Sequence, residues 1–491
     1  MLRIATTALA IAGGFLASAA NGVHPPKLIR QILPLVIGFA MLAASPLKAA
    51  DMSDSELENL VRRSYQYVAL FNTINNFAVN PQNPFAAGGW NRTHYPTGLM
   101  NASVRALPRP NNDTLYVLSL LDLRKEPVII HYPAFGSKYV SLETTAFDHY
   151  CEIPLATSKG DFKKPTSILY YSARTEGYSG EPVEGVDRVM EMSGDFAIAF
   201  LRVMPEANDP EKFKANMAAV NAVKLQTLSE FQGKPAKAPD PLAMPAYSND
   251  QNVFASNFQE AMQFVFNHTT FDPEKYEMDR EALAALKAVG VEPGRVFDQS
   301  NAPEIDGKRL AEVAAKIAAE QNATWNDPQK VAPFLFRVFL PKGQIDLDTM
   351  VIQSVVGPVG VPASEAMYPG IATPDGAPMN AEHDYVIRMT KDQLPPANAF
   401  WSATLYDTKQ GFFIPNKENK YSVGENAGMK LDESGGIAIY IAAEKPEGVP
   451  TENWLPITRE NLGIDVIMRV YEPDLEKMKT WVAPKAEMLN Q

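Results

Sequence analysis

The sequence contains a single cysteine, Cys151, in 491 residues. One thiol cannot form a disulfide within its own chain. Its neighbours Tyr150 and Ile153 are typical of a strand or a strand end, and free cysteine is among the most frequently buried residue types. We therefore predict that Cys151 is a buried structural residue and not a reactive thiol.

Basic residues are outnumbered: 45 Lys and Arg stand against 57 Asp and Glu, a formal net charge of −12. Residues 1–50 hold four of the basic residues and no acidic one, which leaves 41 against 57 and a net charge of about −16 for the remainder. Nucleic acids and anionic lipid surfaces are bound by basic patches. We expect no nucleic-acid partner and, after removal of an N-terminal signal, no membrane partner.

Several catalytic motifs are also missing. The sequence has neither the Gly-x-Ser-x-Gly elbow of serine hydrolases nor the His-Glu-x-x-His motif of zinc hydrolases. Gly357-Pro358-Val359-Gly360 has too few glycines for a phosphate-binding loop, and its proline lacks an N–H donor. The sequence predicts no metal site and no cofactor.

Long apolar runs occur only before residue 50, at residues 4–20 and 32–44. The second run is preceded by basic residues and followed by small residues that end in Ala49-Ala50, which is the order of a secretory signal. It is too short to cross a bilayer comfortably. We predict cleavage near Ala49 or Ala50 and a periplasmic or secreted protein; the first run is an upstream extension of the reading frame, a retained anchor or an unused start.

The rest of the chain is long enough for two or three domains. Ser53-x-x-Glu56 is a capping box that predicts a helix over residues 53–78, and Asp209-Pro210 predicts the start of a helical region. Short β-branched or aromatic segments lie on either side of that region, which is typical of a sandwich or jelly roll. They are residues 126–132, 138–147, 166–171 and 195–203, then 350–356, 384–389, 399–406, 412–414, 437–442 and 464–471.

The predicted fold is therefore mostly β with a helical insert, α+β, in which two jelly-roll-like β-sandwich domains are joined by a helical region. The predicted parts are a signal region (1–50), an N-terminal helix (51–78), an N-terminal β domain (79–204), a helical middle region (205–345) and a C-terminal β-sandwich domain (346–491).

The segment Arg109-Pro110-Asn111-Asn112-Asp113-Thr114-Leu115-Tyr116 joins turn residues to an apolar strand, so it holds a polar loop at the end of a rigid element. With the residues that follow, it resembles the bacterial domain-of-unknown-function family 1254. Glu365-Ala366-Met367-Tyr368, Phe400 to Asp407, Asn453-Trp454-Leu455-Pro456 and Arg469-Val470-Tyr471 resemble the companion family 1214. The resemblance implies two jelly-roll-like domains with helices between them, in a chain that is usually exported and often oligomeric.

The first set of candidate site residues is Asp113 with Glu143, to which Asp148 and His149 could be added. Two carboxylates in a partly buried cleft can divide into a general acid and a general base, and a histidine can join them in holding a metal. Asn111, Asn112 and Tyr116 would contact the substrate. In the alternative, Asp113 accepts hydrogen bonds from the Asn111 and Asn112 amides of its own turn, and Glu143 faces solvent.

The second set lies in the C-terminal region, where Arg388 and Arg469 lie on predicted strands and Tyr406 lies on the same strand face as Ser402 and Thr404. Lys420 and Tyr421 belong to a following loop, and similar proteins commonly carry arginine in place of Lys420. Together these groups would suit the carboxylate or sulfate-like group of a ligand. In the alternative, they form a solvated outer sheet face.

We predict an exported hydrolase or lyase that acts on a small polar or sugar-like molecule, with Asp113 and Glu143 as acid and base. The alternative is a noncatalytic periplasmic protein that binds a small-molecule ligand or serves in an oligomeric assembly. The long segment 80–109, which contains Trp90, His94 and Tyr95, predicts a homo-oligomer, because a lone subunit would have difficulty covering these aromatic side chains.

Overall fold

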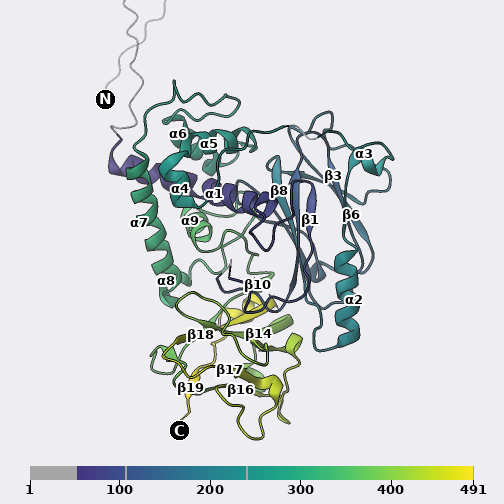
Figure 1. Ribbon diagram of the computed structural model, residues 1–491, viewed down its shortest axis with the longest axis vertical. Helices are drawn as coiled ribbons and strands as arrows, with labels where there is room; N and C mark the ends of the chain where they lie inside the picture. Colours follow the sequence, from purple (N-terminus) through teal and green to yellow (C-terminus); the bar gives the residue numbers. More distant parts are fainter. Residues whose placement is uncertain (1–51, 106–107, 239–240, 490–491) are drawn as a thin grey trace, which may run out of the picture. The chain divides into compact units, whose positions relative to one another are not determined.

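The first helix organises the helical part of the molecule. The computed structural model describes residues 52–105, 108–238 and 241–489, so the predicted signal and its cleavage site lie outside the described residues (Figure 1). Helix α1 (Asp54–Val79) begins at the predicted capping box: the Ser53 side chain accepts from the Glu56 N–H, and the Glu56 side chain accepts from the Ser53 N–H. Along its length α1 contacts α4, α5, α6, α7 and α9.

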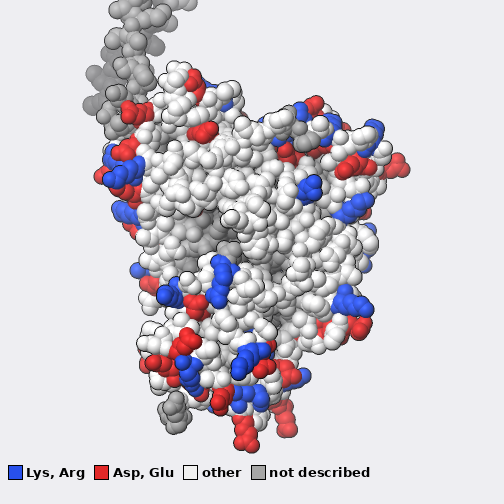
Figure 2. Space-filling view, viewed as in Figure 1, with Lys and Arg blue, Asp and Glu red and all other residues white. Residues whose placement is uncertain are grey.

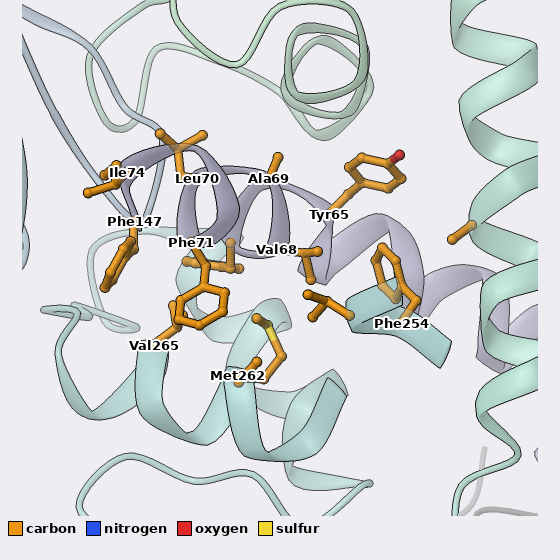
Figure 3. Packing of buried hydrophobic residues seen from close by; sticks show 14 of the residues in the cluster. Tyr65, Val68, Ala69, Leu70, Phe71, Ile74, Phe147, Phe254, Met262 and Val265 are labelled. Atoms are coloured by element: carbon orange, nitrogen blue, oxygen red, sulfur yellow. The ribbon is translucent and has the colours of Figure 1, made fainter. Parts of the chain in front are cut away.

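The apolar face of α1 is the centre of the largest hydrophobic cluster. Figure 3 shows Val68 and Phe71 of α1 directed toward Met262 and Val265 of α5, with Phe147 beside Phe71. These five side chains are fully buried. The helices that follow α1 are α2 (Pro210–Asn221), α3 (Leu228–Phe231), α4 (Asp250–Ser256), α5 (Phe258–Asn267), α6 (Glu277–Lys287), α7 (Gly307–Trp325), α8 (Pro328–Val331), α9 (Leu347–Val356) and α10 (Leu475–Met478).

Two sheets make up the N-terminal β region. In the first the strand order is β1-β2-β8-β4-β5, and in the second it is β7-β6-β3-β9. Side chains from both sheets pack into one shared hydrophobic cluster. The strands are β1 (Arg92–His94), β2 (Leu115–Asp122), β3 (Val128–Tyr132), β4 (Val140–Ala146), β5 (Glu152–Ala156), β6 (Thr166–Ser172), β7 (Arg188–Met192), β8 (Phe196–Val203) and β9 (Lys224–Thr227).

Two further sheets make up the C-terminal β region. The path β10-β18-β14-β15 forms the first, with β11 and β12 also paired to β18, and β17-β16-β13-β19 forms the second; both contribute to one hydrophobic cluster. The strands are β10 (Ala366–Met367), β11 (Gly370–Ile371), β12 (Met379–Asn380), β13 (Tyr385–Met389), β14 (Ala397–Asp407), β15 (Ser422–Gly424), β16 (Ile437–Ala442), β17 (Trp454–Pro456), β18 (Gly463–Pro473) and β19 (Ala486–Met488).

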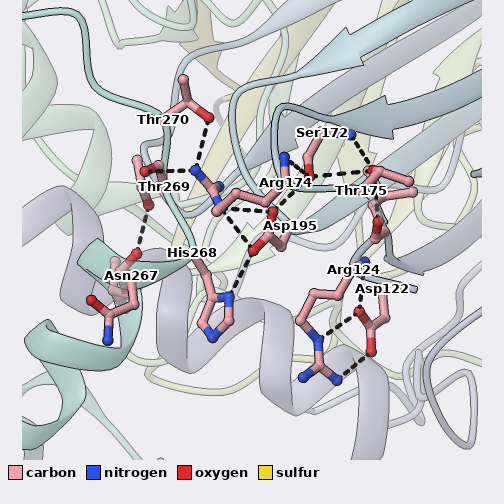
Figure 4. A network of polar contacts seen from close by, with 12 residues as sticks. Asp122, Arg124, Ser172, Arg174, Thr175, Asp195, Asn267, His268, Thr269 and Thr270 are labelled. Carbon is pink, nitrogen blue, oxygen red and sulfur yellow. Dashed lines mark hydrogen bonds and ion pairs between the residues drawn. The ribbon is translucent and has the colours of Figure 1, made fainter. Parts of the chain in front are cut away.

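A polar network centred on Asp195 ties helix α5 to the N-terminal sheets (Figure 4). The Asp195 carboxylate accepts from Ser172 Oγ at 2.6 Å and from Arg174 Nε at 3.0 Å, and its Oδ2 lies 2.7 Å from His268 Nδ1. Asp195 directly precedes β8, and His268 directly follows α5. Although burial opposes the effect, these hydrogen bonds hold the pKa of Asp195 below its usual value.

Two of the predicted strands are wrong. Residues 350–356 belong to helix α9, which begins where the Asp346 side chain accepts from the Thr349 N–H. A short apolar run does not distinguish a buried helix from a buried strand, and the cap decides the outcome here. Residues 412–414 form no strand; Phe413 instead stacks between the rings of Tyr406 and Tyr421, at 5.4 and 4.7 Å.

The fold class is α+β, with many strands in open sheets and ten α-helices among the described residues. Strand β9 lies inside the region predicted to be helical, because the chain returns after α2 to pair with β3. Cys151 is buried and free, as predicted. In the described ranges no helix has both the length and the apolar character needed to cross a bilayer.

The aromatic side chains of segment 80–109 pack on their own chain. Trp90 contacts the Phe196 ring at 4.8 Å, His94 contacts the Phe85 ring at 5.9 Å, and the Tyr95 hydroxyl donates to the Val223 carbonyl at 2.6 Å. The homo-oligomer stays a prediction. These aromatic side chains no longer argue for it, because they pack within their own chain.

Candidate functional site

One face of the first N-terminal sheet carries polar side chains that border a cavity. In the register of β2, β8 and β4, Tyr116 lies opposite Arg202, and Arg202 lies opposite Ser141. The next row on the same face places Leu118 beside Phe200, and Phe200 beside Glu143. Alternation along the strands therefore directs this polar row away from the hydrophobic cluster that the two sheets share.

The first cavity has a volume of about 370 Å³. Its lining is mostly apolar and comes from the end of α1, from β2 and β8, and from the segment that follows α9. Figure 2 shows that the charged side chains lie mainly toward the edges of the molecule, and that the hollow in this face is surrounded mostly by uncharged ones. The lining residues are Thr73, Asn76, Phe77, Asn83, Phe85, Tyr116, Leu118, Phe200, Arg202, Gly357, Pro358 and Val359.

Arg202 is the cation in the wall of this cavity. Its side chain is 6% exposed and forms an ion pair with Glu143, whose side chain is 2% exposed. Its guanidinium also lies over the Phe200 ring, 4.0 Å from the centroid, and 5.6 Å from the centroid of Tyr116. Because a guanidinium has five N–H donors and only Nη1 is bonded to protein among the described residues, Arg202 can donate to a ligand.

Burial raises the pKa of the Glu143 carboxyl, and the neighbouring Arg202 opposes that rise. The alternative in which Glu143 faces solvent is wrong, because all seven residues of β4 are buried. The buried Glu143 carboxylate and the Arg202 guanidinium neutralise each other. Removing either one alone would leave a buried charge unpaired.

Asp113 lies in a second polar cluster, where the loop before β2 meets β14 and β18. Its Oδ2 accepts from Ser402 Oγ at 2.6 Å and from the Tyr471 hydroxyl at 3.1 Å. Its Oδ1 is buried and has no hydrogen-bond partner among the described residues. Burial raises the pKa of Asp113, while Arg469 and the two hydroxyl donors act against that rise.

The turn itself is held by a different residue from the one that the alternative interpretation named. Asn111 Oδ1 accepts from the Asp113 N–H at 2.6 Å and from the Thr114 N–H at 3.1 Å. Asn111 Nδ2 also donates to the Tyr471 hydroxyl at 3.0 Å. The Asp113 side chain is thereby left free to bond across to the C-terminal sheet and does not cap its own turn.

Several other predicted site residues surround this loop. Arg469 Nη2 donates to the carbonyls of Arg109 and Pro110 at 3.0 and 3.4 Å, and the Tyr406 hydroxyl donates to the Pro110 carbonyl at 2.7 Å. Asn112 Oδ1 accepts from Ser422 Oγ at 3.1 Å. The solvated-face alternative is therefore wrong for Tyr406 and Arg469, which are both buried.

The remaining predicted residues lie elsewhere. Arg388 is exposed and pairs with Glu487, and buried His149 has its Nδ1 2.9 Å from Ser354 Oγ. Buried Tyr421 packs on Phe413. Lys420 is half-buried, and burial lowers its pKa to about 8.

Sequence reasoning missed three parts of the site: Arg202, Tyr368 and the segment 357–359. A signal existed for Arg202, because it is a charged residue inside the apolar strand Phe196–Val203. Tyr368 lines a neighbouring cavity and is 39% exposed. The sequence excludes Gly357-Pro358-Val359-Gly360 as a phosphate-binding loop, and the structure places its first three residues in the lining of the cavity.

In the part of the chain that the structure describes, no group of three or more His, Cys, Asp or Glu side chains is arranged so that it could hold a metal ion. The two carboxylates predicted as an acid and base pair each have separate partners: Glu143 bonds to Arg202, and Asp113 bonds to Ser402 and Tyr471.

Two family models match the chain. The model described as "Protein of unknown function (DUF1254)" matches residues 90–227, and the one described as "Protein of unknown function (DUF1214)" matches residues 365–475. The first range contains Asp113, Tyr116 and Arg202, and the second contains Tyr368 and Tyr471. The Asp113 cluster therefore combines residues from both matched regions.

A solved structure shares the fold. The VPA0106 protein from Vibrio parahaemolyticus is 23% identical with a TM-score of 0.67, and the match covers 89% of this chain and 99% of that one. An uncharacterized protein from Burkholderia cenocepacia is 12% identical with a TM-score of 0.40, over 89% and 94% of the two chains. No curated protein matches the chain.

Proposed function

We propose that this chain, which belongs to the family that combines a DUF1254 domain with a DUF1214 domain, binds a small, largely apolar molecule that carries a hydrogen-bond-accepting oxygen. The observation that carries the proposal is Arg202, a buried guanidinium that borders a mostly apolar cavity and has N–H donors beyond the one bonded to Glu143. A cavity of this size, with a few polar groups in an apolar lining, is typical of a small-molecule site.

The polar groups define what the ligand must offer. The Tyr116 hydroxyl has no hydrogen-bond partner among the described residues, and the phenol borders the same cavity as Arg202. Both groups donate, so an acceptor oxygen on the ligand would satisfy them. The Glu143 carboxylate balances the Arg202 charge, which favours a neutral oxygen over a second anion. The apolar lining points to a less polar ligand than the sugar-like molecule expected from the sequence.

Hydrolysis or elimination, with Asp113 of the second polar cluster as the proton-transferring group, is the second candidate function. Asp113 supports it, because this buried carboxyl has a raised pKa and one oxygen without a partner among the described residues. Tyr471 donates to its other oxygen and holds the carboxyl in place. The separate partners of Asp113 and Glu143 favour Asp113 alone, and not a pair of carboxylates, as the proton-transferring group.

The test is a screen of small neutral ketones, esters and ethers by thermal shift, followed by calorimetric titration of compounds that stabilise the protein. Tyr116→Phe should weaken the binding of such compounds about tenfold, the equivalent of one hydrogen bond to an acceptor. Arg388→Met, which removes a surface arginine distant from the cavity, is the matched control and should leave affinity unchanged. If no compound binds, or if Tyr116→Phe binds every compound as the wild type does, the proposal is wrong.

Turnover of a bound ester would separate the second function from the first. Asp113→Asn should then abolish product formation while binding persists. Equal turnover by wild type and Asp113→Asn would remove Asp113 from the reaction.

Three further features belong to the same proposal. Residues 1–50 support export to the periplasm or secretion, where a free small molecule would reach the site. Shared hydrophobic clusters between paired sheets support a jelly-roll-like sandwich in each β region. A homo-oligomer remains an expectation from the family resemblance.

A further inference from the structure

A second cavity lies next to the first. It has a volume of about 160 Å³ and is lined by apolar side chains of α7, of the segment before α9 and of β10, together with Tyr368. Gly357 and Val359 line both cavities. The short segment after α9 therefore lines one side of both spaces and is their shared wall.

Close packing fixes that shared wall. A Cβ atom added at Gly360 would overlap the Phe339 ring, so the segment passes this ring at a distance that only glycine permits. Phe339 is itself buried and lines the second cavity. The shared wall therefore packs against the Phe339 ring on the side that faces the second cavity.

Each cavity has polar groups in its lining: Arg202 and Tyr116 in the first, and Tyr368 in the second. Tyr368 follows β10, whose Ala366 lies opposite Tyr471 in β18, so Tyr368 lies beside the cluster of Asp113 and Tyr471. Its surface is 39% exposed, but it lines a cavity, and removal from bulk water raises the pKa of Tyr368 to about 12. Arg202 is the neighbouring charge that most opposes this rise in pKa, and Tyr116 adds to the rise.

Resting on the proposed function, we propose that the two cavities are two compartments of one site, and that the ligand is an elongated neutral molecule with a central acceptor oxygen and an apolar arm on each side. Arg202, Tyr116 and Tyr368 bind the oxygen at the boundary. One arm occupies the larger cavity beside Phe77 and Leu118, and the other occupies the smaller cavity beside Leu335.

The geometry excludes simpler ligands from tight binding. A molecule with its oxygen at one end would fill only one compartment and would leave the other apolar lining in contact with water or empty. A charged carboxylate would bring a second anion close to Glu143, which already neutralises Arg202. A dialkyl ketone with similar arms meets both conditions.

Two ketones test this inference on the full-length chain. 5-Nonanone has a butyl arm on each side of its carbonyl, and 2-hexanone has one butyl arm and one methyl. Titration calorimetry should give 5-nonanone an affinity about tenfold or more above that of 2-hexanone, because its binding transfers three further methylene groups from water into the second compartment.

Three variants at two half-buried lining residues, Leu335 and Thr73, assign the arms to the compartments. Leu335→Trp narrows the smaller cavity and should remove the advantage of 5-nonanone while changing 2-hexanone by less than about twofold. Thr73→Phe narrows the larger cavity and should weaken both ketones about tenfold. Leu335→Ala, which adds space and needs no repacking around a larger ring, should retain 5-nonanone and bind the longer 6-undecanone more tightly than the wild type does.

The outcomes separate the two proposals. If neither ketone binds the wild type, the proposed function fails, and the two-compartment site fails with it. If both ketones bind but Leu335→Trp keeps the advantage of 5-nonanone, and Leu335→Ala gains nothing for 6-undecanone, the two-compartment inference is overturned while the proposed function stands.

Discussion

The hydroxyl of Tyr471 donates a hydrogen bond to Asp113 Oδ2 across 3.1 Å, although the two residues are 358 positions apart in the sequence. Tyr471 lies in β18, and its ring stacks on Phe400 of the neighbouring strand β14, with centroids 4.1 Å apart. This bond joins the loop before β2 to the C-terminal sheet, so it couples the two regions that supply the candidate site.

The coupling between Asp113 and Tyr471 can be measured by a double-mutant cycle. Tyr471→Phe removes the donor to Asp113 and the acceptor of Asn111 Nδ2, and we expect it to lower the free energy of unfolding by about 2 kcal/mol. Asp113→Asn keeps an acceptor oxygen and should cost about 1 kcal/mol or less. Urea denaturation of both single variants and the double variant should give a coupling of roughly 0.5 to 3 kcal/mol. Strictly additive losses would show that the hydrogen bond contributes nothing.

The two buried aspartates should respond to pH in opposite directions. The pKa of Asp113 is raised by burial, so its ionised form destabilises the fold. The stability of the wild type relative to Asp113→Asn should therefore be greatest below the unfolded pKa of about 3.9, and should decline as the pH rises through the higher folded pKa. Thermal melts from pH 3 to pH 8 measure this; a difference that grows with pH would contradict it.

Asp195 is the matched case with the same substitution. Hydrogen bonds from His268, Arg174 and Ser172 hold its pKa below the usual value despite burial. Its stabilising contribution is present above the unfolded pKa of about 3.9 and is lost as the pH falls through the lower folded pKa. Asp195→Asn should cost about 3 kcal/mol near pH 7 and distinctly less near pH 3. An equal cost at both pH values would show that the charge of the Asp195 carboxylate does not contribute to stability.

Substitutions at Tyr116 test whether its ring faces a ligand or is only part of the hydrophobic core. Its ring contacts Phe200 edge-on at 4.7 Å, but part of it borders the cavity. Tyr116→Phe should leave the free energy of unfolding within about 0.5 kcal/mol of wild type, because the hydroxyl has no partner among the described residues. Tyr116→Ala should cost less than the roughly 3 to 5 kcal/mol expected for a fully buried aromatic side chain. Chemical denaturation provides both values, and a large loss in Tyr116→Phe would mean that the hydroxyl has a structural role.

Lys420 should be unusually reactive for a lysine. Burial lowers its pKa to about 8, so near pH 8 about half of its amino groups are neutral and nucleophilic. A limiting amount of an acetylating reagent at pH 8 should modify half-buried Lys420 ahead of Lys417, an exposed lysine in the same loop. Peptide mass spectrometry reads out both sites in one sample. Faster acetylation of Lys417 would show that access, and not the pKa, controls the reaction.

Gly360 should be intolerant of even one added carbon. Gly360→Ala forces the shared wall or the Phe339 ring to move, and we expect a loss of roughly 1 to 3 kcal/mol in the free energy of unfolding. Gly357→Ala is the control, because an added Cβ there meets nothing within 4 Å. Thermal and urea melts compare the two; equal stability would show that the wall yields without cost.

The sequence by itself determined the local structure wherever a short motif has a direct physical consequence. The capping box at Ser53 starts α1, Asp209-Pro210 starts α2, and the apolar run after Asp113 forms β2, because caps, proline geometry and strand periodicity act over a few residues. The same reasoning failed at residues 350–356, where a short apolar run fits a buried helix as well as a buried strand.

Only the tertiary structure decided which side chains face one another. Strand register places Arg202 beside Tyr116 and next to Glu143, and the long-range approach of β18 places Tyr471 on Asp113. No local pattern encodes such contacts, because the partners are separated by tens to hundreds of residues and meet only when sheets and helices pack. That is why Asp113 and Glu143 could be selected from the sequence, whereas the Arg202 cavity and its shared wall could not.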